Sequence, residues 1–248
     1  WSVRRAALSV FTHEGYRRTL AAGREDRSIV TPATWITKAD ILDAGSAQIA
    51  WDAKTMPVRV ILPARLTEGK GIDVLIEAMS SNGAADLNVS VDVIGDGPLR
   101  AQVAEAVARL GPDRLRLLDP VPYGAPFMEL LRGYHAVLVP SITDEQPRIL
   151  FDATSQAVPV LASDTEGHYG LISEGVNGWR FEAANAGALL KALRQAGSEP
   201  MSLRRLGLKA RIWAEGRTHD AMHLARARRL ATLCRDRTTI IAALLVGV

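Results

Sequence analysis

The sequence is poor in cysteine and in aromatic residues, and each shortage makes certain kinds of site or partner less favoured. The only cysteine, Cys234, excludes an intrachain disulfide and argues against a cysteine-based metal site, as is typical of a reducing cytosol. Aromatic residues make up 5% of the chain and do not interleave with the arginines that crowd residues 203–236. Nucleic acid is therefore the least favoured partner, because single strands are held largely by stacking on aromatic rings.

A long apolar run is also missing. The tail at 238–248 is apolar, but its eleven residues are too few to span a bilayer. Its pattern leaves open a strand, the packed end of a helix or a disordered end. The net charge is +3, and the arginines of residues 203–236 indicate the solvated face of a helix, with contact to anionic lipid as the alternative.

The histidines do not form a recognisable metal motif. His219 and His223 lie one helical turn apart, a spacing that can chelate a metal ion. No Glu lies between them as an HExxH motif requires. We therefore expect no metal and no other cofactor.

The 248 residues can bury a full core, and from Pro57 onward predicted strands and helices alternate. Alternation of this kind is typical of βαβ units and a parallel sheet. We therefore predict an α/β fold with a Rossmann-like, doubly wound parallel sheet. The expected strands are 58–64, 88–95, 114–118, 135–141, 159–163 and 177–182. The expected helices are 71–81, 98–110, 125–134, a short one at 167–174, 185–197, 200–215 and 218–234.

Residues 1–56 fit this alternation poorly. A strand is predicted at 8–12 and a helix at 14–22, followed by linker, helix and connector. We interpret this region as the end of a preceding domain. The chain begins with Trp1 rather than Met, as expected of a fragment or a processed chain.

The stretch 139–163, VPSITDEQPRILFDATSQAVPVLAS, is the most informative part of the sequence. It predicts two buried strands joined by an acidic loop and a helix. Pro147 suits the first helical position, which makes Gln146 the N-cap. The free amides of Arg148 and Ile149 would then face the carboxyl edge of the sheet, where α/β proteins bind phosphate.

Two further loops follow predicted strands and are expected at the same edge. Arg65 and Lys70 could clamp a diphosphate, although by themselves they also suit a surface Arg and a Lys at a helix start. Gly95 and Gly97 permit a close backbone approach to a ligand, and a plain tight turn is equally compatible with them.

Arg148 occupies an unfavourable place for a cation, because the positive end of a helix dipole lies there. Something negative should compensate. The pattern leaves two possibilities open, an ion pair with Asp152 or the acids just before it, and a bound anion.

Together these motifs resemble the C-terminal, donor-binding domain of retaining GT-B glycosyltransferases of the family 4 type. The resemblance covers roughly 57–215 and rests on segments that occur in the family's order: ARLTEGKGIDVLIEAM, VIGDGP, VLVPSITDEQPRILFDATSQAVPVLASD and GVNGW. It implies that Arg65 and Lys70 hold the diphosphate of a nucleotide-sugar donor. It also implies that Asp152 binds the ribose hydroxyls, with Asp144 or Glu145 near the transferred sugar.

The chain departs from the family pattern in the acidic loop. Both acids are Asp rather than the usual Glu if their spacing of eight residues is kept, and Glu145 is the usual residue type one position away. The usual Gly-Phe-Gly is replaced by Gln146, Pro147 and Arg148. These changes affect the geometry of the donor site and hence which sugar it takes.

The resemblance also divides the chain. It implies an acceptor-domain remnant and linker at 1–56, the donor-binding domain at 57–215, and a crossing helix with the apolar tail at 216–248. The implied activity is transfer of a sugar, with retention, from a nucleotide-diphosphate sugar to an acceptor hydroxyl, and the fragment alone is expected to be inactive. The alternatives are a nucleotide- or phosphate-binding module without turnover, and a GT-B relative that acts as an epimerase or phosphorylase.

The expected partners are the nucleotide-sugar donor and a glycan, lipid-linked or small-molecule acceptor. Peripheral contact with a membrane is a further expectation, and nucleic acid is not one. We expect a cytoplasmic location, with the inner face of the cytoplasmic membrane as an alternative.

Overall fold

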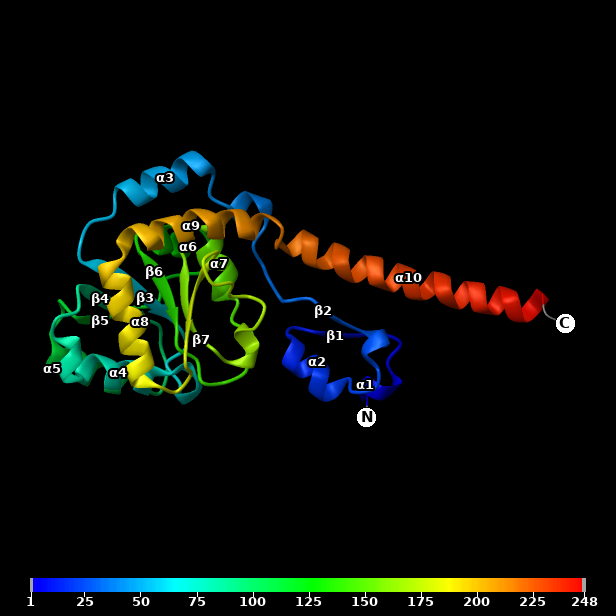
Figure 1. The fold of residues 1–248 in the computed structure, drawn as a ribbon, viewed down its shortest axis with the longest axis horizontal. Helices are drawn as coiled ribbons and strands as arrows, with labels where there is room; N and C mark the ends of the chain where they lie inside the picture. Colours follow the sequence, from blue (N-terminus) through cyan, green and yellow to red (C-terminus); the bar gives the residue numbers. More distant parts are fainter. Residues whose placement is uncertain (1, 247–248) are drawn as a thin grey trace.

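The computed structural model describes the chain from residue 2 to residue 246. Its main body is a six-stranded sheet with helices on both faces, and every pair of neighbouring strands is parallel (Figure 1). From edge to edge the strands are β5 (Leu115–Leu118), β4 (Val89–Ile94), β3 (Val58–Pro63), β6 (Ala136–Val139), β7 (Val160–Ser163) and β8 (Gly178–Phe181). The predicted Rossmann-like fold is confirmed.

The strand order creates a switch point between β3 and β6. The chain runs from β3 outward through β4 to β5, then returns to the middle and continues through β6 and β7 to β8. At such a point the connections leave the sheet in opposite directions and open a crevice beyond the carboxyl ends of the strands. The loops predicted to carry the site follow β3 and β6, which flank this switch point, and β4, which neighbours β3.

Two apolar cores pack against the sheet, because successive side chains of a strand point to opposite faces. Val60 and Leu62 belong to the core beneath helices α4 (Ile72–Ser80), α5 (Arg100–Leu110) and α8 (Ala186–Ser198). Ile61 belongs to the core beneath α6 (Ala125–Arg132) and α7 (Ile149–Ser155).

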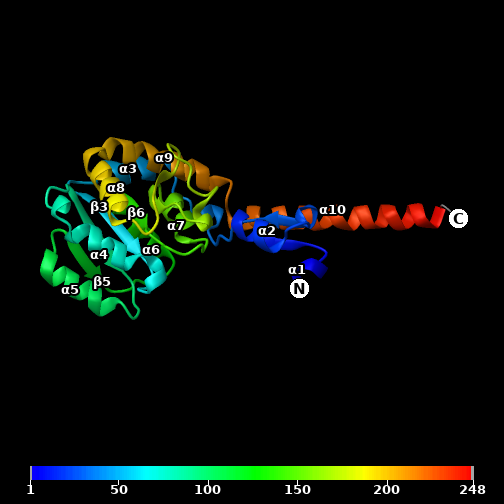
Figure 2. The same cartoon turned by 60° about the horizontal axis from the view of Figure 1, so that its bottom comes forward.

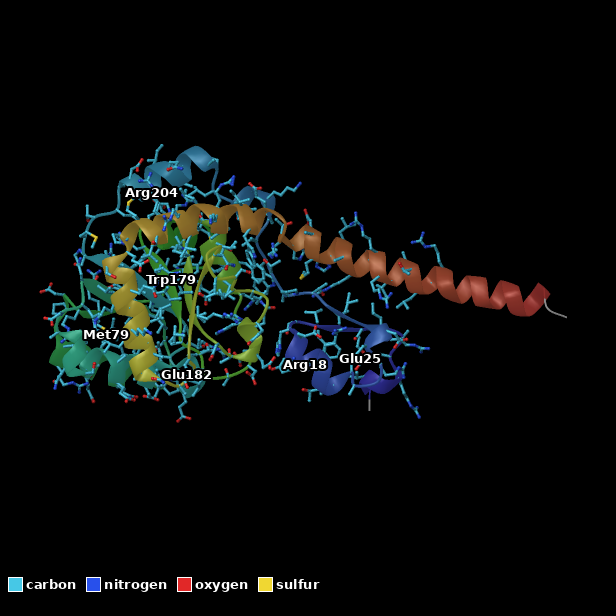
Figure 3. The ribbon with its side chains drawn as sticks, viewed as in Figure 1. Arg18, Glu25, Met79, Trp179, Glu182 and Arg204 are labelled. Atoms are coloured by element: carbon cyan, nitrogen blue, oxygen red, sulfur yellow. The ribbon has the colours of Figure 1, made fainter. Side chains whose placement is uncertain are left out.

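Helix α9 (Pro200–Glu215) joins the peripheral elements to this body. It packs against α7, β8 and α3 (Ala44–Asp52). Arg204 lies on α9 (Figure 3). It forms an ion pair with Asp52 at the end of α3, with 2.7 Å between Nη2 and Oδ1.

The N-terminal region forms a small piece of its own. Strands β1 (Ser9–Phe11) and β2 (Ser28–Val30) pair in parallel, with α2 (Glu14–Leu20) between them and α1 (Ser2–Arg5) before them. Two views show this piece beside α10 and apart from the main sheet (Figures 1 and 2). The sequence predicted β1 and α2 but missed β2, which is only three residues long.

The last helix, α10, spans His219–Val246 and extends well beyond the main body in both views (Figures 1 and 2). Near its start the His219 amide donates to the Ile36 carbonyl at 2.8 Å, and the Arg226 side chain donates to the Thr31 hydroxyl at 3.0 Å. The backbone of the tail is helical up to Val246, so the strand considered from the sequence is wrong. The packing of its side chains lies outside the described residues.

Two local predictions are wrong. Helix α7 begins at Ile149 with Arg148 as its N-cap, not at Pro147 with Gln146 as N-cap, because the Gln146 side chain is bonded to a distant backbone instead. The short helix expected at 167–174 is instead a single 3-10 turn, Glu166–His168.

The remaining 3-10 turns are Glu25–Arg27, Lys38–Asp40, Glu68–Lys70 and Asn82–Ala84. Within residues 2–246, none of the helices combines the length and hydropathy needed to cross a membrane.

Candidate functional site

A cleft of about 740 Å³ opens at the carboxyl edge of the sheet, at the switch point between β3 and β6. The loops that follow β3, β4, β5 and β6 line it, together with the linker between β2 and α3, residues 31–43. Of the predicted site residues, the cleft brings together Arg65, Lys70, Gly95, Glu145, Gln146, Pro147, Arg148, Ile149 and Asp152. Gly97 and Asp144 do not line it.

The two glycines of the loop after β4 are required by the protein's own backbone. Gly95 has φ of 147°, and a Cβ there would lie 1.9 Å from the Ala64 carbonyl oxygen. A Cβ on Gly97, with φ of 150°, would lie 2.6 Å from the Leu66 carbonyl oxygen. The glycines therefore let the loops after β3 and β4 pack together, and Gly95 also forms part of the cleft wall.

Lys70 is positioned by a close approach of two loops. Gly71 follows it in the left-handed conformation, and a Cβ there would lie 1.9 Å from the Pro140 carbonyl oxygen. This brings the Lys70 ammonium into an ion pair with the Glu145 carboxylate. The Lys70 hydrogen bond and charge, with a smaller contribution from Arg65, hold the pKa of Glu145 below its usual range. The cation predicted for the diphosphate is thus paired with an anion of the chain itself.

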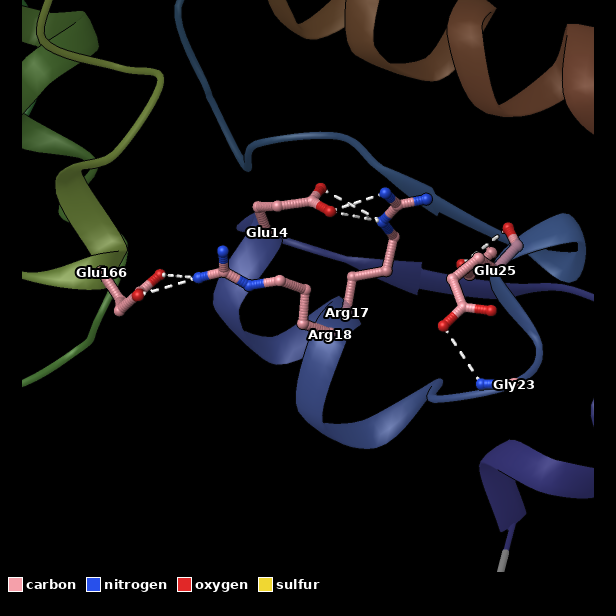
Figure 4. A network of polar contacts seen from close by, with 7 residues as sticks. Glu14, Arg17, Arg18, Gly23, Glu25 and Glu166 are labelled. Atoms are coloured by element: carbon pink, nitrogen blue, oxygen red, sulfur yellow. Dashed lines mark hydrogen bonds and ion pairs between the residues drawn. The ribbon is translucent and has the colours of Figure 1, made fainter.

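Asp144 faces the N-terminal piece. Its carboxylate accepts a hydrogen bond of 3.1 Å from the Glu166 amide. Glu166 in turn binds Arg18 of α2 through both carboxylate oxygens, at 2.8 Å each (Figure 4). His13 lies close by, where burial lowers its pKa against the opposing charge of Asp144. Of the two acids considered for the sugar side, Glu145 lines the cleft.

Asp152 is buried in the wall of the cleft, with 6% of its surface exposed. The Tyr123 hydroxyl donates a hydrogen bond of 3.0 Å to its Oδ1 atom. Burial raises the pKa of Asp152 to about 6, although the Tyr123 hydrogen bond and the Arg148 charge act in the opposite direction. A carboxyl group in this setting can accept hydrogen bonds from hydroxyl groups of a ligand.

Arg148 is not paired with any of the acids considered from the sequence among the described residues, since Glu145 pairs with Lys70 and Asp152 accepts from Tyr123. Its guanidinium lies over the Trp35 ring, 3.8 Å from the ring centroid, and forms no ion pair with the described Asp152 side chain. The backbone amides of Arg148 and Ile149 have no hydrogen-bond partner among the described residues. They remain available at the start of α7, as the sequence predicted.

Sequence reasoning missed the aromatic residues of the site. Trp35 comes from the linker, Tyr123 from the loop after β5 and Phe127 from α6, and all three line the cleft. The ring centroids of Trp35 and Tyr123 are 6.3 Å apart, and those of Tyr123 and Phe127 are 6.1 Å apart. Tyr123 could have been found because it follows a strand of the parallel sheet, whereas Trp35 carries no such signal.

The described part of the chain contains no group of three or more His, Cys, Asp or Glu side chains placed to hold a metal ion. His219 and His223 lie together on α10, with 3.1 Å between their Nε2 atoms, and have no third ligand of this kind among those residues.

Comparisons with known proteins agree with this fold. The family described as Glycosyl transferases group 1 matches residues 48–213. The amylovoran biosynthesis glycosyltransferase AmsK of Erwinia amylovora is 31% identical over 153 residues, which are 57% of this chain and 36% of that protein. The chain thus spans little more than a third of the length of the curated relatives it matches.

Solved structures show the same fold at lower identity. HepE of Anabaena, solved in complex with UDP, has a TM-score of 0.73 and 19% identity, covering 93% of this chain and 65% of that chain. Sucrose-phosphate synthase of Thermosynechococcus elongatus has a TM-score of 0.77 and 18% identity, covering 94% of this chain and 60% of that chain.

Proposed function

Because the chain belongs to the family of glycosyl transferases group 1, we propose that it carries the donor-binding half of a glycosyltransferase. The donor is a nucleotide-diphosphate sugar, and the acceptor is a hydroxyl group of a glycan, lipid-linked or small molecule. Residues 1–56 belong to the acceptor domain and its linker in this proposal, and residues 57–215 to the donor domain. The observation that carries it is the cleft at the β3–β6 switch point, with two cations and two free amides at one edge.

The chemistry follows from where charge develops. As the bond between sugar and nucleotide breaks, negative charge builds on the leaving diphosphate. Arg65, Lys70 and the amides at the start of α7 would stabilise that charge, which is how preorganised donors lower a barrier. These groups supply the positive charge that the leaving group needs, so the proposed reaction requires no metal ion. The acceptor hydroxyl attacks the anomeric carbon from the face on which the diphosphate leaves, its proton passes to an oxygen of that diphosphate, and the sugar keeps its anomeric configuration.

Asp152 and Glu145 would have different tasks. Asp152 would accept hydrogen bonds from the ribose hydroxyls through its buried carboxyl group. Glu145 would leave Lys70 when the diphosphate arrives and lie close to the transferred sugar. HepE, TarM of S. aureus and pneumococcal GtfA were solved with UDP, which supports a uridine nucleotide as the first donor to test.

A second candidate is a nucleotide-binding module without turnover. Its support is the placement of Asp144, whose carboxylate accepts from the Glu166 amide rather than lining the cleft. Such a module would bind nucleoside diphosphates through Arg65 and Lys70 but would not transfer sugar.

The test compares Lys70→Ala with Lys191→Ala, an exposed lysine of α8 outside the cleft. In the full-length protein, we expect the change at Lys70 to reduce sugar transfer by at least about a hundredfold, as loss of one stabilising donor does. The change at Lys191 should leave transfer intact. Transfer is measured with a radiolabelled UDP-sugar. Normal turnover after loss of Lys70 contradicts the assignment, and UDP binding without transfer by the unchanged protein selects the module.

A further inference from the structure

Trp35 is an exposed ring on a firmly held segment. Its neighbours Thr34 and Ile36 are 2% and 1% exposed, whereas Trp35 is 58% exposed. The Gln146 side chain forms two hydrogen bonds to the Ala33 backbone, of 2.6 Å and 2.9 Å. The exposure of the ring is therefore not a consequence of a loose linker. A large aromatic surface held in water next to a cleft is typical of a ligand contact.

Trp35 does not stand alone in the cleft. Tyr123 is 56% exposed, and its ring lies at 84° to that of Trp35. The Arg148 guanidinium covers part of the Trp35 ring, 3.8 Å from the centroid, and this cation–π contact restrains the indole. Trp35 and Tyr123 thus form an aromatic wall whose ring positions are set before any ligand binds.

The wall has an apolar surface next to a polar anchor. The Tyr123 hydroxyl is bonded to Asp152, the carboxyl group proposed for the ribose. The cations proposed for the diphosphate come from the loop after β3, whereas the wall comes from the linker and from the loop after β5. When the phosphates of a nucleotide lie at Arg65 and Lys70 and its ribose lies at Asp152, its flat base still needs a binding surface. The wall offers that base a stacking surface.

We propose that Trp35 and Tyr123 bind the base of the nucleotide donor, Trp35 by stacking on it, with Arg148 holding the indole in position. This inference rests on the proposed function, since it assigns the base-binding part of the same cleft. It makes the linker between the N-terminal piece and the main sheet a part of the donor site.

The experiment separates the base from the phosphates. The whole chain is titrated calorimetrically with UDP, ADP and GDP, and the tightest of these is compared with inorganic pyrophosphate, which has no base. We expect Trp35→Ala to weaken nucleotide binding about 5- to 100-fold, the range for loss of one stacking contact. Pyrophosphate binding should change less than about twofold, and Trp35→Phe, which keeps a ring, should retain most of the nucleotide affinity.

Tyr169→Ala is the matched control. Tyr169 is 57% exposed and has the Arg180 guanidinium over its ring at 5.1 Å, but it lies outside the cleft. Its loss should leave nucleotide binding unchanged. Melting temperatures and circular dichroism of each variant show whether it is folded, and Trp35→Phe provides the comparison if Trp35→Ala is not.

Each remaining outcome decides between the two proposals. Equal nucleotide affinity in the unchanged chain and in Trp35→Ala overturns the base contact and leaves the donor site standing. An equal loss for nucleotide and pyrophosphate also overturns it, because the effect is then not on the base. Failure of the unchanged chain to bind either ligand removes the donor site, and the inference with it.

Discussion

Replacing either of two buried aspartates by Asn is predicted to change the stability of the fold in opposite directions: the change at Asp152 stabilises it, and the change at Asp92 destabilises it. Each accepts a hydrogen bond from a tyrosine hydroxyl, at 3.0 Å from Tyr123 and at 2.6 Å from Tyr134. Asp92 also binds Arg116 and Arg59, with shortest distances of 2.7 Å and 3.0 Å. Among the described residues, the carboxylate of Asp152 is hydrogen-bonded to Tyr123 and to no arginine. The difference lies in whether burial of the negative charge is compensated.

The size of the effect at Asp152 follows from its pKa. Burial raises that pKa from 3.8 to about 6. The stabilisation that comes from the protonated carboxyl group is complete below about pH 4 and is lost as the pH rises through about 6. At pH 8 the ionised carboxylate therefore costs about 3 kcal/mol of folding free energy, at about 1.4 kcal/mol per pKa unit. Asp152→Asn removes this cost and leaves an oxygen for the Tyr123 hydroxyl.

We expect Asp152→Asn to raise the melting temperature at pH 8 by roughly 5–10 °C for a chain of this size. At pH 4.5 the gain should shrink to about 1 kcal/mol, because Asp152 is then mostly protonated in the folded protein. Asp92→Asn should lower the melting temperature at pH 8 by the equivalent of roughly 2 kcal/mol. Burial alone would raise the pKa of Asp92, but the hydrogen bonds from Arg116, Tyr134 and Arg59 outweigh that effect and keep the pKa low.

The assay is thermal unfolding followed by circular dichroism at both pH values. A lower melting temperature for Asp152→Asn at pH 8, or an equal gain at both pH values, refutes the reasoning. If Asp152 also binds ribose, the same variant should bind UDP more weakly although it is more stable. A trade of this kind separates a functional carboxylate from a structural one.

Two further predictions concern the loops around the cleft. Glu145→Gln frees Lys70 from its ion pair and should tighten the binding of inorganic pyrophosphate by up to about fivefold, as expected for loss of an exposed ion pair. The binding is measured by calorimetry. Weaker binding by the variant would mean that Glu145 contributes to anion binding. Gly95→Ala should lower the free energy of unfolding by roughly 2–5 kcal/mol, because the new Cβ meets the Ala64 carbonyl in a strained conformation. Gly216→Ala is its control in urea titrations, since a Cβ there meets nothing within 4 Å, and equal losses would contradict the steric explanation.

Much of the main body could be predicted from the sequence because its signals are local. Strands β3, β6 and β7 are apolar apart from Arg59 and Ser163, since a central parallel strand is covered on both faces. Once the strands are parallel, every loop at a carboxyl end lies on one edge of the sheet. Arg65 and Lys70 could therefore be placed beside the acidic loop before any contact was known.

The features that could not be predicted from the sequence depend on contacts between distant parts of the chain. Gln146 was expected to cap α7, but its amide bonds to Ala33, 113 residues away in the chain. Asp144 and Glu145 are adjacent in the sequence, but Asp144 accepts a hydrogen bond from the Glu166 amide whereas Glu145 pairs with Lys70 in the cleft. For Gly95 and Gly97 the sequence left a ligand approach and a plain turn equally open, and only the structure shows that the neighbouring loop after β3 leaves no room for a Cβ at either position.

The sequence by itself determined the α/β class, the parallel sheet and the set of charged loops at its edge, because apolar periodicity and turn residues act over short distances. Tertiary structure alone decided the pairing of Lys70 with Glu145, the burial that raises the pKa of Asp152, and the place of Trp35 in the cleft. Those properties depend on which distant side chains and how much water surround a group. No local pattern records that information.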